Sequence, residues 1–146
     1  MKVLFWIITL FTCSSVFGQT TCKKCDVSKA QVIEIHEQNL TYNVVSEFLC
    51  TFDSVCNNNV EFSEYSNKIL FRVLANAPEL YFNVLENEKL DKNLFLRAIE
   101  NPIDDSINLQ EIYDKIKRSS VSNLIKSEYS NSILTAANKT GTKIKK

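Results

Sequence analysis

Cysteine is the residue type in this sequence with the clearest capacity for chemistry, and Cys22 and Cys25 form a C-x-x-C motif. Two lysines lie between these cysteines, and a segment with helical periodicity follows directly. A positive environment at a helix N-terminus favours the reactive thiolate that thiol–disulfide exchange requires. Redox C-x-x-C motifs normally follow a β-strand in a βαβ unit, however, and no strand pattern precedes this one. A thiol or redox centre at Cys22 and Cys25 is therefore the alternative to a structural role.

The cysteines Cys22, Cys25, Cys50 and Cys56 are an even number, which predicts two disulfides in an exported chain. Residues 27–52 carry apolar side chains mostly three or four positions apart, without Gly or Pro, so they are expected to form one long helix. A straight helix of this length spans about 40 Å, whereas a disulfide needs Cα atoms within about 7 Å. We therefore favour two local bridges, Cys22–Cys25 and Cys50–Cys56.

The expected long helix has one weak point at residues 39–43, where helix propensity is lowest. A turn near Asn39 would divide the helix into two antiparallel arms and bring the two cysteine pairs together. The disulfides would then cross-link a small helical hairpin instead of closing local loops. This arrangement is the alternative to the straight helix.

Residues that could bind a metal are scattered along the sequence. The spacing of Cys50 and Cys56 is wider than the two to four residues that separate paired ligands in common zinc sites. His36 is the only histidine and is expected at the border of an apolar helix face. Asp104 and Asp105 lie in an expected loop without the spaced acidic residues of a calcium-binding loop. We therefore predict neither a metal site nor a cofactor.

The N-terminus has the pattern of a secretory signal peptide, expected at residues 1–18. A basic start precedes the apolar run 3–11, which is shorter than the roughly 20 residues that cross a bilayer. Cleavage after Gly18 would remove Cys13 and leave a chain that begins at Gln19. Phe and Thr precede Cys13 and suit a lipid-attachment motif poorly. We expect an exported protein, periplasmic or extracellular, without an integral membrane span.

Charge is distributed unevenly, although the formal net charge is zero. Residues 22–115 contain nine Lys or Arg and sixteen Asp or Glu, whereas residues 116–146 contain seven and one. We favour an interpretation in which the basic end packs on the acidic body. The alternative is that the acidic helical surface receives a basic protein partner. The basic end has no interleaved aromatic residues, so we do not expect nucleic-acid binding.

Helical periodicity and capping residues recur along the whole chain, which contains only 2 Gly and 2 Pro. The sequence predicts an all-α fold with a single domain at 19–138 and a basic flexible tail at 139–146. We expect five or six helices in an irregular orthogonal or solenoid-like bundle. The expected helices are 27–52, 64–75, 78–85, 92–99, 109–116 and 121–137. Four of them have an expected N-cap, namely Asp26, Ser63, Asp91 and Asn108, and Pro78 is expected at the first position of its helix.

Function is indicated chiefly by what the sequence lacks. It shows no pairing of a nucleophile with a base, no cluster of metal ligands and no glycine-rich phosphate loop. We therefore expect a small, exported, non-enzymatic helical protein that acts by protein binding and is stabilised by disulfides. The alternatives are an envelope thiol or redox protein that uses Cys22 and Cys25, and a periplasmic immunity-type inhibitor.

Overall fold

The computed structural model describes residues 22–145, and every regular element in this range is helical. The expected signal peptide, its cleavage site and Cys13 lie outside the described residues. The helix count exceeds the expected five or six, because the segment 27–52 is divided. The elements are α1 (Val27–Ile35), α2 (Tyr42–Leu49), the 3-10 helix η1 (Ser54–Asn58), α3 (Val60–Asn76), α4 (Pro78–Asn87), α5 (Lys92–Ile99), α6 (Leu109–Arg118) and α7 (Asn123–Thr140).

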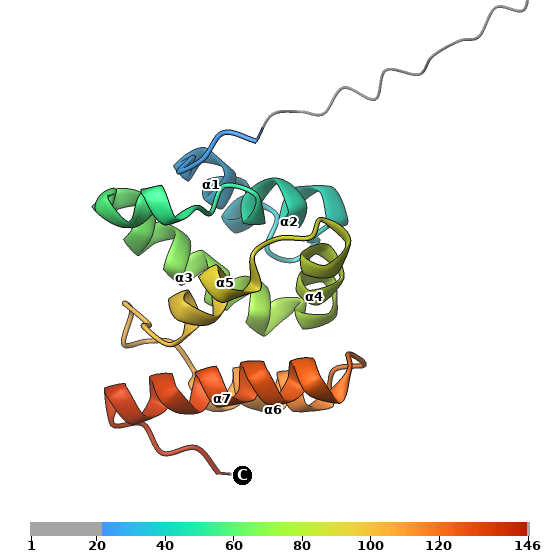
Figure 1. Ribbon diagram of the computed structural model, residues 1–146, viewed down its shortest axis with the longest axis vertical. Helices are drawn as coiled ribbons and strands as arrows, with labels where there is room; N and C mark the ends of the chain where they lie inside the picture. Colours follow the sequence, from blue (N-terminus) through green and yellow to red (C-terminus); the bar gives the residue numbers. More distant parts are fainter. Residues whose placement is uncertain (1–21, 146) are drawn as a thin grey trace, which may run out of the picture.

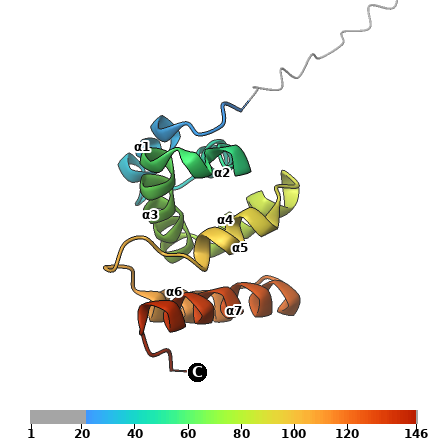
Figure 2. The same ribbon diagram turned by 60° about the vertical axis from the view of Figure 1, so that its left-hand side comes forward.

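The helices form an irregular bundle around α3 (Figures 1 and 2). The helices α1 and α2 lie at one end of the molecule, and α6 and α7 form a layer at the other end. Between them, α3 packs against α1, α4, α5 and α6, while α5 also contacts α7. The central position of α3 agrees with its wide apolar face, in which the buried residues include Ile69, Leu70, Val73 and Leu74.

Most helices begin at a side chain that accepts a hydrogen bond from the first turn, as expected for free helix N-termini. Asp26, Asp91 and Asn108 do so for α1, α5 and α6, as the sequence predicts. The helix α3 begins earlier than predicted, because Asn59 accepts from Phe62 N at 3.1 Å. Ser63, the expected cap, instead donates its hydroxyl to the Cys56 carbonyl at 3.1 Å.

The prediction of one straight helix over 27–52 is wrong. The first arm, α1, ends at Ile35, and α2 begins after Thr41, whose side chain accepts from the Val44 N–H at 3.5 Å. Within the turn, Asn39 N–H donates to the His36 carbonyl at 2.8 Å, while Leu40 packs against the core. The burial of Leu40 and the cap at Thr41 therefore stabilise a turn in the region of weakest propensity.

Aromatic side chains dominate the centre of the core. The rings of Tyr81 and Tyr129 lie edge to face with centroids 5.7 Å apart, and Phe82 contacts Tyr129 at 4.8 Å. A second group is formed around Phe52, whose ring lies 5.1 Å from that of Phe95. The edge-to-face pairs join α4 to α7, the tilted Phe52–Phe95 pair joins the segment after α2 to α5, and all add to the free energy of burial.

The basic end of the chain packs mainly through apolar contacts. The ion pair between α7 and the body joins Lys92 of α5 to Glu128 of α7 at 2.7 Å, so the acidic partner lies on the basic segment. In the described part of the chain, Lys117, Arg118 and Lys126 form no ion pair. The basic end therefore packs on the acidic body, but within the described residues its Lys and Arg side chains form no ion pair with acidic residues of that body.

The segment that follows α7 folds back toward α6. The helix extends to Thr140 and ends at Gly141, whose φ of 73° is the left-handed conformation that glycine adopts readily. Lys145 N–H then donates to Gln110 Oε1 at 2.7 Å, and Gln110 Nε2 donates to the Lys145 carbonyl at 3.1 Å. Ile144 packs against the core between these points.

Candidate functional site

The disulfides join Cys22 to Cys50 and Cys25 to Cys56, with Cα–Cα distances of 6.0 and 5.5 Å. The favoured local bridges are therefore wrong, and the cross-linked hairpin is the arrangement present. The reason is the turn between α1 and α2, which returns the chain to its starting point. Because Cys22 and Cys25 belong to different bridges, no C-x-x-C disulfide is formed, and the geometry does not favour the redox alternative.

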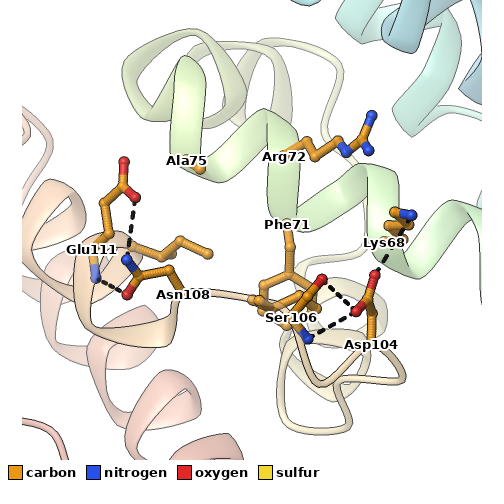
Figure 3. A pocket seen from close by; sticks show the side chains of 10 residues that line it. Lys68, Phe71, Arg72, Ala75, Asp104, Ser106, Asn108 and Glu111 are labelled. Atoms are coloured by element: carbon orange, nitrogen blue, oxygen red, sulfur yellow. Dashed lines mark hydrogen bonds and ion pairs between the residues drawn. The ribbon is translucent and has the colours of Figure 1, made fainter.

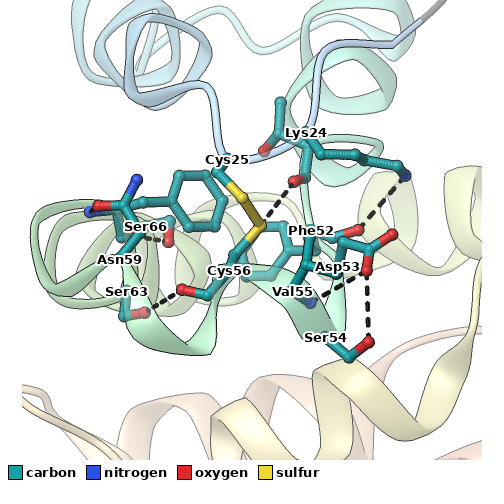
Figure 4. The surroundings of a disulfide bond; sticks show 12 residues. Lys24, Cys25, Phe52, Asp53, Ser54, Val55, Cys56, Asn59, Ser63 and Ser66 are labelled. Carbon is teal, nitrogen blue, oxygen red and sulfur yellow. Dashed lines mark hydrogen bonds between the residues drawn. A yellow bond between two sulfur atoms is a disulfide. The ribbon is translucent and has the colours of Figure 1, made fainter.

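The segment 22–25 is held against the end of α2 by polar contacts as well (Figure 4). Lys24 Nζ donates to the Cys50 carbonyl at 2.7 Å and to the Phe52 carbonyl at 3.4 Å. A cation is favourable there because helix C-termini carry partial negative charge. Cys25 N–H donates to the Thr51 carbonyl at 2.9 Å, and Cys25 has a left-handed φ of 56°. Two disulfides and these bonds fix one wall of the depressions described below.

The other polar residues singled out in the sequence do not converge on a reactive centre. His36 is exposed at the C-terminal end of α1. Asp104 accepts from Ser106 N–H at 2.8 Å and from Ser106 Oγ at 2.5 Å, and these bonds hold the pKa of Asp104 below its usual value. Asp105 is exposed. Among residues 22–145, no group of three His, Cys, Asp or Glu side chains is placed to hold a metal ion.

One depression lies between α3, α6 and the loop that precedes α6 (Figure 3), with a volume of about 240 Å³. Its floor includes the buried Phe71, and its rim carries charged side chains that already have partners. Lys68 Nζ lies 3.6 Å from Asp104 Oδ2, and Arg72 lies 2.8 Å from Glu34. Because these charges pair with one another or with adjacent helices, this depression presents little charge to select a ligand.

A second depression, the α3–α5 groove, has a volume of about 300 Å³. It runs beside the Cys25–Cys56 disulfide. Buried Asn67 fixes the opposite wall, because its Nδ2 donates to the Ala98 carbonyl at 2.8 Å and its Oδ1 accepts from Ile103 N–H at 3.1 Å. The apolar residues that line the groove are Phe52, Phe62, Leu94, Ala98 and Ile103.

A third depression, the Lys89 depression, adjoins the α3–α5 groove and has a volume of about 520 Å³. The two share four lining residues, Phe52, Asp53, Leu94 and Arg97, so together they make an extended concave surface. The Lys89 depression lies between the end of α2 and the loop that joins α4 to α5. Its remaining charged lining residues are Lys24, Lys89 and Asp91.

The charged side chains that line these two depressions differ in whether they already have a hydrogen-bond or ion-pair partner. Asp53 accepts from Val55 N–H at 3.1 Å and Asp91 accepts from Asn93 N–H at 3.0 Å, because both carboxylates cap helices. Within residues 22–145, no ion pair or side-chain hydrogen bond engages Arg97 or Lys89. The two linings together hold three cations, Lys24, Lys89 and Arg97, and two carboxylates, Asp53 and Asp91, so the surface combines an apolar floor with a small excess of positive charge.

Sequence reasoning did not identify this site. Its lining comes from four separate segments: residue 24, the end of α2 with η1, the first half of α3, and α5 with its flanking loops. Arg97 falls on the exposed side of a short amphipathic helix, where a charged residue is ordinary. The disulfide candidates Cys25 and Cys56 were the sequence signal closest to the site.

No protein family model, curated protein or solved structure matches this chain. Within residues 22–145, none of the helices combines the length and the apolar character that crossing a lipid bilayer requires. The two disulfides and this lack of a span are compatible with an exported protein. The α3–α5 groove and the adjoining Lys89 depression are therefore the features of this chain that best indicate a function.

Proposed function

We propose that this protein is an exported, non-enzymatic domain, periplasmic or extracellular, that binds a protein partner through the α3–α5 groove. The observation that carries the proposal is the apolar floor of the groove together with exposed apolar residues beside it. Ile103 lines the groove and is 51% exposed, and Val55, next to the lining residue Cys56, is 71% exposed. Side chains of this kind gain free energy when a partner covers them, at about 25 cal/mol per Å².

The shape of the site suits an extended segment of a partner. The α3–α5 groove and the Lys89 depression adjoin, so a chain segment can place successive side chains in both. The disulfide Cys25–Cys56 and the hydrogen bonds of Asn67 hold opposite walls in place before binding. Preorganised walls reduce the conformational entropy that a binding site loses, which favours affinity from a small contact area.

The acidic helical surface is a second candidate contact. Glu61 and Glu64 on α3, and Glu79 and Glu86 on α4, are exposed and have no cationic partner in the described part of the chain. A partner with a basic surface would be attracted to these residues, most strongly at low ionic strength. An immunity-type inhibitor of a basic toxin would use such a surface.

A capture experiment with matched variants distinguishes the α3–α5 groove from the acidic helical surface as the contact with the partner. The chain from residue 19 serves as bait in an extract of the native envelope or medium, beside a Val55→Ser/Ile103→Ser variant and a Leu124→Ser control. Leu124 is 68% exposed on α7, away from the groove, so the control removes an equally exposed apolar side chain. We expect one partner that the wild type and the control retain and the groove variant loses, with the wild type and the control still holding it in high salt.

Two results would contradict the groove as the contact. Retention of the same partner by the Val55→Ser/Ile103→Ser variant would remove the groove from the interface. Loss of the partner from all three baits in high salt would indicate that the partner binds the acidic surface, because salt screens charge pairs and strengthens apolar burial.

A further inference from the structure

We propose that the α3–α5 groove binds the C-terminal end of a peptide chain and that Arg97 is the residue that holds its carboxylate. This inference rests on the proposed function, because it names the chemistry of the segment that occupies the groove. Arg97 lies in the last turn of α5 and lines both the groove and the Lys89 depression. It therefore stands at the junction of the two, where a bound chain could end.

The guanidinium of Arg97 is available to a ligand. Three of the other charged lining groups are engaged: Lys24 by backbone carbonyls, Asp53 by Val55 N–H and Asp91 by Asn93 N–H. Lys89 also has no side-chain partner in the described residues, but it lines only the Lys89 depression, whereas Arg97 lines both. Arg97 has five N–H donors in a planar fork, and no side chain in the described region accepts from them. This cation differs from Arg72, whose guanidinium is held by Glu34 at 2.8 Å.

Asp53 is the carboxylate that lines both depressions together with Arg97. Its pKa is lowered, chiefly by the Val55 backbone N–H, and the cation that contributes is Lys24. Within residues 22–145, no ion pair joins Arg97 to Asp53, so the guanidinium is open to a ligand although both residues line the two depressions.

The groove also matches the chemistry of a peptide C-terminus. A carboxylate is planar and accepts two parallel hydrogen bonds from a guanidinium, a geometry that gives both strength and orientation. Leu94 lies one turn before Arg97 on α5, and it shares both linings with Arg97 and Phe52. An apolar last side chain would therefore pack on Leu94 and Phe52 while its carboxylate meets Arg97. Lys89 adds a second, more distant positive charge.

The test is an NMR titration of the ¹⁵N-labelled mature chain with two matched probes. N-acetyl-Leu-Leu carries a free carboxylate, and N-acetyl-Leu-Leu-amide is the same peptide without charge. Wild type, Arg97→Gln, Arg97→Lys and the control Arg118→Gln are compared, because Arg118 is exposed on α6 and remote from the groove. Arg97 is itself exposed, so its replacement is expected to leave the fold intact.

We expect the acid to shift amide signals of the groove in wild type and to bind about tenfold or more tightly than the amide, as a charge-assisted hydrogen-bonded pair gives. Arg97→Gln should abolish this preference, Arg97→Lys should keep part of it, and Arg118→Gln should match wild type. Equal binding of acid and amide to wild type would overturn the role of Arg97 and leave the groove as a binding site. If neither probe shifts groove signals, the groove itself is contradicted.

Discussion

The hydroxyl oxygens of Tyr81 and Tyr129 lie 3.0 Å apart inside the core, where one donates a hydrogen bond to the other. Both residues are fully buried, and they join α4 to α7. Burial raises the pKa of both phenols, because the interior disfavours the phenolate. This pair links the layer of α6 and α7 to the remaining helices through a polar contact in an otherwise apolar region.

The raised pKa values of Tyr81 and Tyr129 predict a loss of stability at alkaline pH. In the unfolded chain a tyrosine ionises near pH 10, whereas in the folded protein both phenols stay neutral well above that value. The stabilisation is fully present below about pH 10 and is lost as pH rises toward the folded pKa, by up to roughly 1.4 kcal/mol per pH unit for each group. Urea unfolding at about pH 9 and about pH 11 measures the loss. A Tyr81→Phe/Tyr129→Phe variant with the same alkaline slope would contradict the assignment.

Removing one hydroxyl of the pair should cost more than removing both. Tyr129→Phe leaves the Tyr81 hydroxyl buried without a partner, which destabilises by about 1–3 kcal/mol. The double variant Tyr81→Phe/Tyr129→Phe replaces both polar groups by apolar ones of the same shape and should be close to wild type. Denaturant unfolding of wild type, Tyr81→Phe, Tyr129→Phe and the double variant gives the coupling energy. Additive single effects would show that the hydrogen bond contributes nothing.

Core and surface leucines should differ sharply in their contributions to stability. Leu70, at the centre of α3, is fully buried, so Leu70→Ala leaves a cavity and should lower the free energy of unfolding by about 2–5 kcal/mol. Leu124→Ala at an exposed position of α7 should change it by less than about 0.5 kcal/mol. Urea midpoints at neutral pH compare the two. Similar losses would contradict the packing around α3.

The two disulfides should be reduced in a fixed order. Cys56 is buried, whereas Cys22 and Cys50 are both partly accessible, so a small thiol should reach the Cys22–Cys50 bridge first. Mild reduction followed by alkylation and peptide mapping identifies the first free cysteines. Labelling of Cys25 and Cys56 first would contradict the order, and a peptide that joins Cys22 to Cys25 would contradict the pairing itself.

The Cys25–Cys56 disulfide, which borders the groove, should both stabilise the fold and order the residues of the groove. Replacing Cys25 and Cys56 together by Ala is expected to lower the free energy of unfolding by about 2–4 kcal/mol, as removal of a long-range cross-link generally does. The same change for Cys22 and Cys50 is the matched control. We expect only the Cys25/Cys56 variant to broaden the NMR signals of Phe52 and Asn57. Identical broadening in both variants would show that neither bridge has a special relation to the groove.

Local features of this fold could be predicted from sequence because they depend on near neighbours. The caps Asp26, Asp91 and Asn108, and the start of α4 at Pro78, follow from short-range rules that the structure confirms. The turn near Asn39 could not be fixed in the same way. No Gly or Pro marks it, and its stability comes from the packing of Leu40 and from distant cysteines.

The candidate site was beyond sequence reasoning for a related reason. Phe52, Asn67 and Arg97 have ordinary local explanations, as an apolar helix-end residue, a polar residue on α3 and a surface cation. The three residues line one groove only in the folded protein. Asn67 there binds the backbone of α5 and of the segment beyond it, and Arg97 lies beside Phe52 in the same lining. Such contacts join residues far apart in the chain, and no single-sequence pattern encodes them.

The course of the two disulfides makes the first two helices a covalently closed unit. Each bridge links the segment before α1 to the segment after α2, with sequence separations of 28 and 31 residues. A protease that cuts the exposed turn between these helices would therefore leave both fragments attached on either side of the cut. In an extracellular environment rich in proteases, such a nicked protein would retain its full mass and the wall of the groove that Cys56 supplies.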